Sequence, residues 1–400
     1  MNTRAAVSKA MANSAAVLTD KGTGAVSVIA LFGGGVREIV YKIFTPSGRK
    51  SRRFRCGGKL LGHIKDRSGI VDEVLVSCLS DNHFRINCHG NPLIVADIME
   101  LLAGYGVKSV SAEKLLAGIY RAEKNLSSIA IEARIFQAHC TSIRGTRLVM
   151  NQAEEGLNRL VQQWHTRLED FSLPQIRAGV EEIFHRSEIA GLIIGGVKLL
   201  LAGPVNTGKS SLLNRLSGRE KSIVTNLSGT TRDRVEAESR FGELAVLLID
   251  SAGLDETLRQ AADAQAQAKT LELIREVDLI VVVLDISQGC SQITGRLSEV
   301  LRDKKVLTVL NKCDLPAHPD ISQLPGYFSG ALCVSAGTGA GIEALKEKIL
   351  SVTGVNQIAL HQPIFFTPRQ ESLLKQLSKA ESKKAASAVI TELLNGRLFV

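Results

Sequence analysis

Long apolar runs and helical segments alternate between residues 197 and 354. Five runs have the continuous apolar character of strands that are buried on both faces. They are VKLLLA at 197–202, LAVLLID at 244–250, LIVVVLD at 279–285, KVLTVL at 305–310 and ALCVSA at 331–336. Because helical segments separate them, the strands are expected to run parallel and to be joined by right-handed crossovers. This part of the chain is predicted to be an α/β domain with a parallel-rich sheet.

The N-terminal part shows short strand-like runs bounded by turn residues. Strands are predicted at 25–32, 36–44, 70–79 and 83–90. A helix is predicted at 93–106, because the apolar residues recur there at intervals of three and four, at Leu93, Ile94, Ile98, Leu101 and Leu102. The mixture predicts an α+β domain over residues 13–120.

Helical periodicity dominates residues 121–196 and returns near the end of the chain. Leu157, Leu160, Val161 and Trp164 follow helical spacing, and Ser172 before a proline marks the start of another helix. The predicted architecture is a helical domain formed by residues 121–196 and a shortened 355–400. The α/β domain at 197–354 is inserted into it, and the α+β domain precedes it.

Composition narrows the class of protein without changing this outline. The 400 residues are 44% hydrophobic and 22% charged, which is typical of a globular chain. No apolar run approaches the roughly 18–20 residues that a membrane span needs. The seven cysteines form no C-x-x-C pair, which favours a reducing compartment over a disulfide framework. We therefore expect a cytoplasmic protein with no membrane association.

Positive charge is concentrated near the N-terminus. The net charge is +9, and residues 1–120 hold sixteen Lys or Arg against nine Asp or Glu, a difference of +7. Seven of these basic residues lie between Lys42 and Lys59, a stretch without any acid. Such a cluster fits the phosphate backbone of tRNA or another RNA. The alternative interpretation is the solvated tip of a hairpin.

The sequence GPVNTGKS, from Gly203 to Ser210, matches the phosphate-loop pattern G-x-x-x-x-G-K-[ST]. A predicted strand leads into it and a predicted helix follows, as this motif requires. In such a loop backbone N–H groups surround a β-phosphate, Lys209 reaches the β- and γ-oxygens, and Ser210 binds Mg²⁺. The candidate nucleotide-binding residues here are Asn206, Thr207, Gly208, Lys209, Ser210 and Ser211.

The sequence NKCD follows the fourth predicted strand of the α/β domain. A carboxylate at Asp314 can accept hydrogen bonds from both N1–H and N2–H of guanine, an arrangement that adenine cannot satisfy. The sequence SAG follows the next strand. This order of motifs predicts GTP as the substrate and GDP as the product, with base contacts from Asn311, Lys312, Asp314, Ser335 and Ala336.

Two further motifs predict the segments that sense the γ-phosphate. DSAG ends the second predicted strand, so Asp250 is expected to hold Mg²⁺ through water and the Gly253 amide to contact the γ-phosphate. Thr231 in GTTRD is expected to complete the Mg²⁺ shell. Leu254 stands where related switches carry a water-orienting glutamine, and the sequence shows no evident arginine finger. A bound cation is therefore expected to contribute to catalysis.

These motifs resemble the G domain of the TrmE/MnmE tRNA-modification GTPases. The resemblance rests on GPVNTGKSSLLNRLSGREKSIVTNLSGTTRD, DSAGLDE, NKCD and VSAGTGAGI, and INCHGNPLIV and LLNGRLF extend it to most of the chain. It implies a Mg²⁺-dependent, K⁺-stimulated GTPase linked to modification of the tRNA wobble uridine. It also implies a homodimer and a partner modification enzyme.

The resemblance assigns further residues to catalysis. In the family an asparagine of the phosphate loop and main-chain groups of the first switch bind K⁺, and these positions correspond here to Asn206, Thr225, Leu227 and Thr230. A general-base glutamate of the family corresponds to Asp263, which is one methylene shorter, so a slow enzyme is expected. Lys209 and Thr231 complete the predicted catalytic set.

The sequence also departs from the family pattern. The family's N-terminal domain binds folate, but Thr23 stands at the position of a folate-contacting arginine and Arg85 at that of a glutamate. The family's cysteine-containing tail has no counterpart after LLNGRLF. These departures weigh against a folate derivative. For the modification chemistry they favour a second hypothesis, in which the chain is a GTP-regulated RNA- or ribosome-binding or assembly module. On that hypothesis RNA binding persists and little or no wobble uridine is modified.

Overall fold

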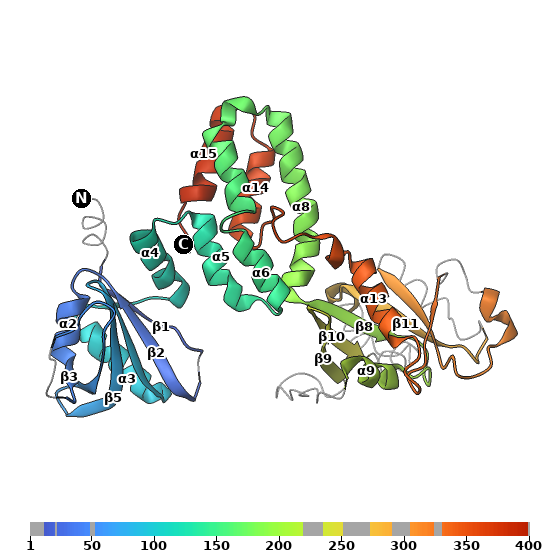
Figure 1. Ribbon diagram of the computed structural model, residues 1–400, viewed down its shortest axis with the longest axis horizontal. Coiled ribbons are helices and arrows are strands. Elements are labelled where there is room, and N and C mark those ends of the chain that lie inside the picture. The colour runs from blue at the N-terminus through green and yellow to red at the C-terminus, as the bar shows by residue number, and fades with distance from the viewer. Residues whose placement is uncertain are drawn as a thin grey trace, which may run out of the picture. The chain divides into compact units, whose positions relative to one another are not determined.

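The computed structural model describes residues 12–20, 22–48, 53–218, 235–250, 273–289, 305–323 and 330–398. The chain divides into two compact units, residues 1–135 with 387–400 and residues 136–386. The first unit contains a sheet with its covering helices, and the second contains a group of helices and another sheet (Figure 1).

The first unit is built on a seven-stranded sheet in the order β3-β4-β5-β6-β2-β1-β7. Neighbouring strands pair antiparallel except β1 and β7, which pair parallel. The predicted strands at 25–32, 70–79 and 83–90 are confirmed. The strands are β1 (Ser14–Val17), β2 (Gly24–Phe32), β3 (Phe44–Pro46), β4 (Lys59–Lys65), β5 (Ile70–Ser80), β6 (His83–Gly90) and β7 (Lys108–Ser109).

Helices cover both faces of this sheet to different extents. Helices α2 (Val36–Ile43) and α3 (Pro92–Gly104) pack on one face over a core that includes Ile29, Phe84 and Ile86. On the opposite face, α4 (Ala112–Lys124) covers part of β1 and β2, and its Leu115 and Ile119 pack there. The predicted helix at 93–106 is therefore confirmed as α3, and the α+β class of this part is confirmed with it.

The strand predicted at 36–44 is wrong. Helix α2 occupies this segment, and strand β3 begins only at Phe44. The β-branched composition favoured a strand. However, Val36, Ile39, Val40 and Ile43 are buried together on one helical face, so packing against the sheet decides the conformation.

The segments predicted to be helical form helices. Ser172 caps α8 as predicted: its hydroxyl accepts from the Gln175 amide, and the Gln175 side chain accepts from the Ser172 N–H. Within the ranges that the structure describes, no helix combines the length and hydropathy needed to cross a bilayer. The helices are α5 (Ser128–Phe136), α6 (Ile143–Asn151), α7 (Leu157–Thr166), α8 (Leu173–Gly195), α14 (Pro368–Ser378) and α15 (Lys383–Asn395).

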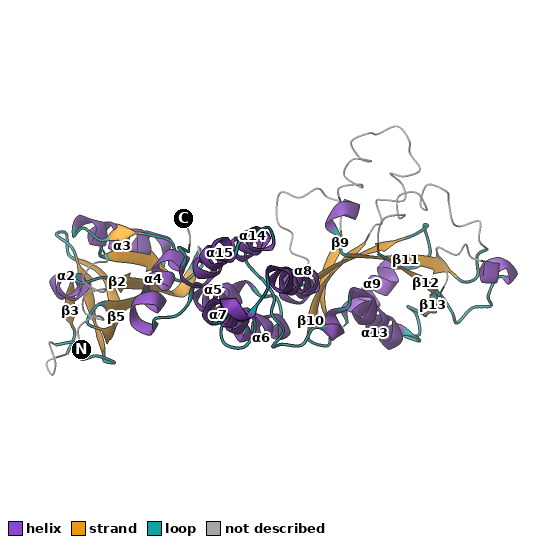
Figure 2. Ribbon diagram, turned by 90° about the horizontal axis from the view of Figure 1, so that it is seen from above, coloured by secondary structure: helices purple, strands orange, loops and turns teal. Residues whose placement is uncertain are grey.

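The second unit contains a six-stranded sheet in the order β13-β12-β11-β8-β10-β9. The five predicted strands are confirmed, and every pair among them is parallel. Figure 2 shows α9 (Lys209–Ser217) and α13 (Ile342–Thr353) on one side of this sheet. The strands are β8 (Val197–Ala202), β9 (Val235–Phe241), β10 (Leu244–Asp250), β11 (Leu279–Asp285), β12 (Val306–Asn311) and β13 (Leu332–Cys333).

Strand β9 is the strand of this sheet that the sequence did not predict. It pairs antiparallel with β10 at the edge of the sheet. Its sequence, VEAESRF, alternates apolar and polar residues, and Ala237 and Phe241 are buried between exposed neighbours. It lacks the continuous apolar run of the central strands because an edge strand buries only part of its surface.

Candidate functional site

The parallel strands β8, β10, β11 and β12 bring the predicted motifs to one edge of the second sheet. The phosphate loop follows Ala202 at the end of β8, and the guanine motif begins with Asn311 at the end of β12. Asp250 and Asp285 are the last residues of β10 and β11. Open α/β sheets bind ligands at the carboxyl ends of their strands, which is the edge where these residues lie.

Two glycines determine the path of the phosphate loop between β8 and α9. A Cβ atom on Gly203, which has φ +140°, would lie 2.2 Å from the Val283 carbonyl oxygen. A Cβ atom on Gly208, the N-cap of α9 with φ +90°, would lie 2.4 Å from Asn311 Nδ2. Only glycine permits both approaches. The loop therefore packs directly against β11 and the guanine motif, and it leads into a helix N-terminus that suits a phosphate group.

Lys209 and Thr207 are both buried in this loop. The Lys209 Nζ donates to the carbonyl oxygens of Gly203 at 2.7 Å and Pro204 at 2.8 Å. The Thr207 Oγ1 donates to the same Pro204 oxygen at 2.9 Å. The lysine cation is thus held against the loop backbone, beside the peptide groups that are predicted to surround a phosphate.

Ser210 and Asp250 meet where α9 begins and β10 ends. The Ser210 Oγ donates to Asp250 Oδ2 at 2.5 Å. Asp250 is only 3% exposed, and its Oδ1 is buried without a hydrogen-bond partner in the described part of the chain. A buried carboxylate oxygen without a partner is costly, and carboxylate and hydroxyl oxygens are the donors that Mg²⁺ prefers. These two residues fit a divalent cation.

Asn206 is exposed on the phosphate loop and has a left-handed backbone, with φ +63°. Asparagine is one of the few residues that adopt this conformation at low cost. The loop can therefore keep its shape while the Asn206 side chain stays accessible to a ligand. Ser211 is also exposed and lies in the first turn of α9.

Asn311 joins the phosphate loop to the loops that are predicted to hold the base. Its Nδ2 donates to the Thr207 carbonyl oxygen at 2.8 Å, and its Oδ1 accepts from the Ala336 N–H at 3.0 Å. Asn311 is 1% exposed, so both bonds are shielded from water. Three segments that are far apart in the sequence are thereby fixed in one site.

Lys312 and Asp314 follow Asn311 in the guanine motif. Lys312 has a left-handed backbone, with φ +64°, and its Nζ donates to Asp285 Oδ2 at 2.7 Å. Burial acts to raise the pKa of Asp285, but hydrogen bonds from Lys312 and Ser287 outweigh it and lower that pKa. Asp314 is exposed, so its carboxylate is open to a base.

The segment after β13 contributes Ser335 and Ala336. Ser335 is 1% exposed, and its hydroxyl oxygen accepts from the Thr338 N–H at 3.1 Å. Arg215 on α9 fixes the same segment, because its guanidinium donates to the carbonyl oxygens of Ala336 at 2.9 Å and Gly337 at 2.5 Å. The phosphate-loop helix therefore supports the base loop directly.

Comparison with known proteins places this geometry in a family. Residues 198–312 match the family described as 50S ribosome-binding GTPase. The tRNA modification GTPase MnmE of Moorella thermoacetica is 30% identical over 377 residues, which cover 84% of this chain and 81% of that protein. The chain belongs to the MnmE family of tRNA modification GTPases. It is therefore a GTP-hydrolysing enzyme, and its second sheet is the core of a P-loop GTPase domain.

Other relatives are similar over comparable lengths. The tRNA modification GTPase MnmE of Aquifex aeolicus is 28% identical over 396 residues, which cover 90% of this chain and 86% of that protein. Among solved structures, the G domain of the T. maritima FeoB iron transporter is 29% identical, with a TM-score of 0.31. The match covers 39% of this chain and 98% of that chain.

Two residues of this MnmE-family site were not predicted from the sequence. Asp285 pairs with Lys312, and Arg215 binds the backbone of the base loop. The signal for Asp285 was its position, because it ends the buried run LIVVVLD at the same sheet edge as Asp250. Arg215 had no comparable signal, since a basic residue in the last turn of a helix is common.

Several predicted site residues of this MnmE-family chain lie outside the residues that the structure describes. They are the predicted switch and K⁺-site residues Thr225, Leu227, Thr230 and Thr231, the predicted γ-phosphate contact Gly253 and the predicted general base Asp263.

Proposed function

We propose that this chain hydrolyses GTP as a step in the modification of the tRNA wobble uridine. The observation that carries the proposal is the pair of bonds made by Asn311, which joins the phosphate loop to the base loops. The tRNA-directed role is supported by the similarity to MnmE proteins along most of the chain, including its first sheet.

In this proposal each part of the site has a separate task. Asp314 accepts from the guanine base, Lys209 neutralises charge on the β- and γ-phosphates, and Ser210 with Asp250 holds Mg²⁺. Mg²⁺ supplies the positive charge that offsets charge developing on the transferred phosphoryl group. Thr231 and Gly253 are proposed to approach from the switch segments. The remaining proposed nucleotide contacts come from Asn206, Thr207, Gly208, Ser211, Asn311, Lys312, Ser335 and Ala336.

Further parts of the proposal concern assembly and place in the cell. We propose a homodimer that acts with a partner modification enzyme, in the domain order 13–120, 121–196, 197–354 and 355–400. A reducing, cytoplasmic setting is supported by the cysteines, because the six in the described ranges are all free. A folate derivative is left out of the proposal, because Thr23 and Arg85 replace an arginine and a glutamate of the family pattern.

The proposed function is tested in a strain whose own MnmE homologue is deleted. This chain should restore the modified wobble nucleoside, measured by mass spectrometry of digested tRNA, and the Lys209→Ala variant at equal expression should not. Restoration by Lys209→Ala would contradict a role for GTP hydrolysis. Absence of the nucleoside with the native chain, together with intact GTPase activity, would instead support the RNA-binding or assembly module.

We predict that hydrolysis depends on K⁺ through Asn206. With Leu254 in place of a water-orienting glutamine, the site needs another positive charge, and the Asn206 side chain lies exposed on the phosphate loop. Replacing KCl by NaCl at equal ionic strength should lower the turnover number about tenfold or more. Asn206→Ala should give the same low rate in both salts, and Asn214→Ala, at an exposed position of α9 outside the proposed nucleotide contacts, serves as the control. Equal native rates in KCl and NaCl would remove K⁺ from the proposal.

Asp263 is proposed as the general base that activates water in this reaction. Its carboxylate is shorter than that of the family's glutamate, so proton transfer is expected to be slow. Asp263→Glu should then raise the K⁺-stimulated rate, while Asp263→Ala should lower it.

A further inference from the structure

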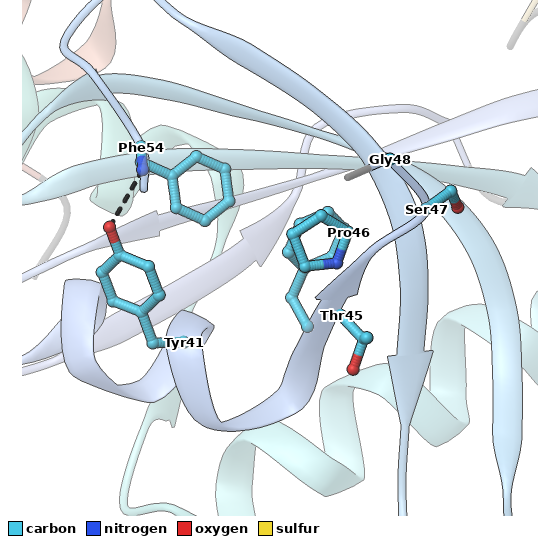
Figure 3. A pocket seen from close by; sticks show the side chains of 7 residues that line it. Tyr41, Thr45, Pro46, Ser47, Gly48 and Phe54 are labelled. Carbon is cyan, nitrogen blue, oxygen red and sulfur yellow. Dashed lines mark hydrogen bonds between the residues drawn. The ribbon is translucent and has the colours of Figure 1, made fainter. Parts of the chain in front are cut away.

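A cavity of about 590 Å³ lies in the first unit, between α2 and the chain that follows β3. Tyr41 and Phe54 border it on one side and Pro46 closes the opposite side, as Figure 3 shows. Phe44, Thr45, Ser47 and Gly48 complete the lining. The volume falls within the range of small-molecule pockets, and three of the seven lining residues, Tyr41, Phe44 and Phe54, are aromatic.

The aromatic wall is fixed before any ligand binds. The Phe54 ring is 5.5 Å from those of Tyr41 and Phe44 and packs edge-on against Phe84 at 5.4 Å. The Phe54 N–H donates to the Tyr41 hydroxyl at 2.9 Å, and Arg37 Nη1 donates to the Phe54 carbonyl oxygen at 3.3 Å. A ligand that stacks here would therefore lose little free energy in ordering the wall.

Tyr41 differs from its aromatic neighbours in its exposure. Phe44 and Phe54 are buried, whereas Tyr41 is 39% exposed although both polar and aromatic contacts hold it in place. An immobilised aromatic side chain with an accessible surface is the usual platform for a planar ring. The cavity is therefore suited to a flat aromatic group.

The segments that flank the cavity carry more basic than acidic residues, although α2 also carries the exposed Glu38. Lys42, Arg53, Arg55 and Lys59 are exposed on these segments, and the sequence from Lys42 to Lys59 contains no acid. The nearby Asp81 is paired with Arg37 at 2.5 Å. An aromatic wall inside a basic rim matches a nucleobase whose phosphate backbone runs outside the cavity.

We propose that this cavity binds one unpaired base of a single-stranded RNA segment, stacked on Tyr41. The base must be unpaired, because a base within an A-form helix does not expose its face. The proposal rests on the proposed function insofar as tRNA, which offers unpaired loop bases, is the natural source of such a segment.

Binding is measured with the full-length protein and a labelled RNA hairpin that carries a seven-nucleotide loop, against a duplex RNA of equal charge. Tyr41→Leu should weaken hairpin binding about tenfold or more, since it removes the stacking surface, and should leave duplex binding unchanged. Tyr41→Phe should stay within about threefold of the native protein. Leu93→Ala is the control, because Leu93 is 74% exposed and does not line the cavity.

A second measurement on the native protein keeps the test independent of folding. A loop base replaced by 4-thiouridine should crosslink, on irradiation, to a peptide that contains Tyr41 or Phe54. Crosslinks confined to other peptides would overturn the proposal, as would equal hairpin affinity for Tyr41→Leu and the native protein.

The outcomes separate this proposal from the proposed function. If the native chain restores the modified nucleoside and Tyr41→Leu binds the hairpin as well as the native protein, the cavity proposal fails alone. If Tyr41 governs hairpin binding but the native chain restores no nucleoside, the role in wobble-uridine modification fails alone. GTP hydrolysis without RNA should be the same for Tyr41→Leu and the native protein.

Discussion

Asp314→Asn should lower the affinity for GTP about 100-fold and should raise the affinity for xanthosine triphosphate. The aspartate carboxylate can accept from two guanine N–H groups, and charge-assisted hydrogen bonds contribute roughly 1.5–3 kcal/mol each. An amide presents one donor and one acceptor, so one of the two contacts becomes unfavourable with guanine. With xanthine the amide N–H instead donates to the carbonyl oxygen at position 2 of the base, so this contact becomes favourable.

The two affinities are measured by competition against a fluorescent GDP analogue. Asp320→Asn is the matched control. Like Asp314, Asp320 follows β12 in the chain, but it is half-exposed and pairs with His318. It should leave both affinities within about twofold of the native values. Unchanged GTP affinity in Asp314→Asn would show that the base is read elsewhere.

Lys209→Ala should lower kcat/KM for GTP by roughly 10²–10³-fold, the range found when one preorganised donor to developing charge is removed. The Lys209 Nζ is already held at the loop by two carbonyl oxygens, so little reorganisation is needed when a phosphate binds. The alanine variant loses that charge and also leaves the Gly203 and Pro204 oxygens without this donor.

Lys198→Ala provides the control for this loss. Lys198 lies on β8, leading into the same loop, but its side chain is exposed and it was not predicted to contact nucleotide. Its hydrolysis rate and thermal midpoint should match those of the native protein. If Lys209→Ala retained native kcat/KM while remaining folded, the phosphate loop would not be the site of hydrolysis.

The second sheet and its motifs could be predicted from the sequence because both leave strong local signals. The central strands are buried on both faces, so they appear as continuous apolar runs. The phosphate-loop and guanine motifs need particular residues for geometric reasons, as Gly203 and Gly208 show. In addition, Ser172 and the proline that follows it predicted the start of α8, because such helix-start signals depend only on neighbouring residues.

The features that escaped prediction depend on contacts between distant segments. Helix α2 has strand-like composition, and its conformation follows from the sheet face that it covers. Asp285 acquires its role only when β11 and β12 lie side by side, which brings it to Lys312. Likewise, the positive charge between Lys42 and Lys59 was evident from the sequence. The packing of Phe54 beside Tyr41 was evident only from the structure.

The central claim is that this chain is a guanine-specific GTPase, and phosphate release by the purified full-length protein tests it most directly. The rate is measured with Mg²⁺ and KCl at equal concentrations of GTP and ATP, below the KM for GTP, for the native protein and Lys209→Ala. The account predicts release from GTP, release from ATP at least about 100-fold slower, and release from GTP roughly 10²–10³-fold slower for Lys209→Ala. Equal release from GTP and ATP, or release from GTP that Lys209→Ala leaves unchanged, would contradict it.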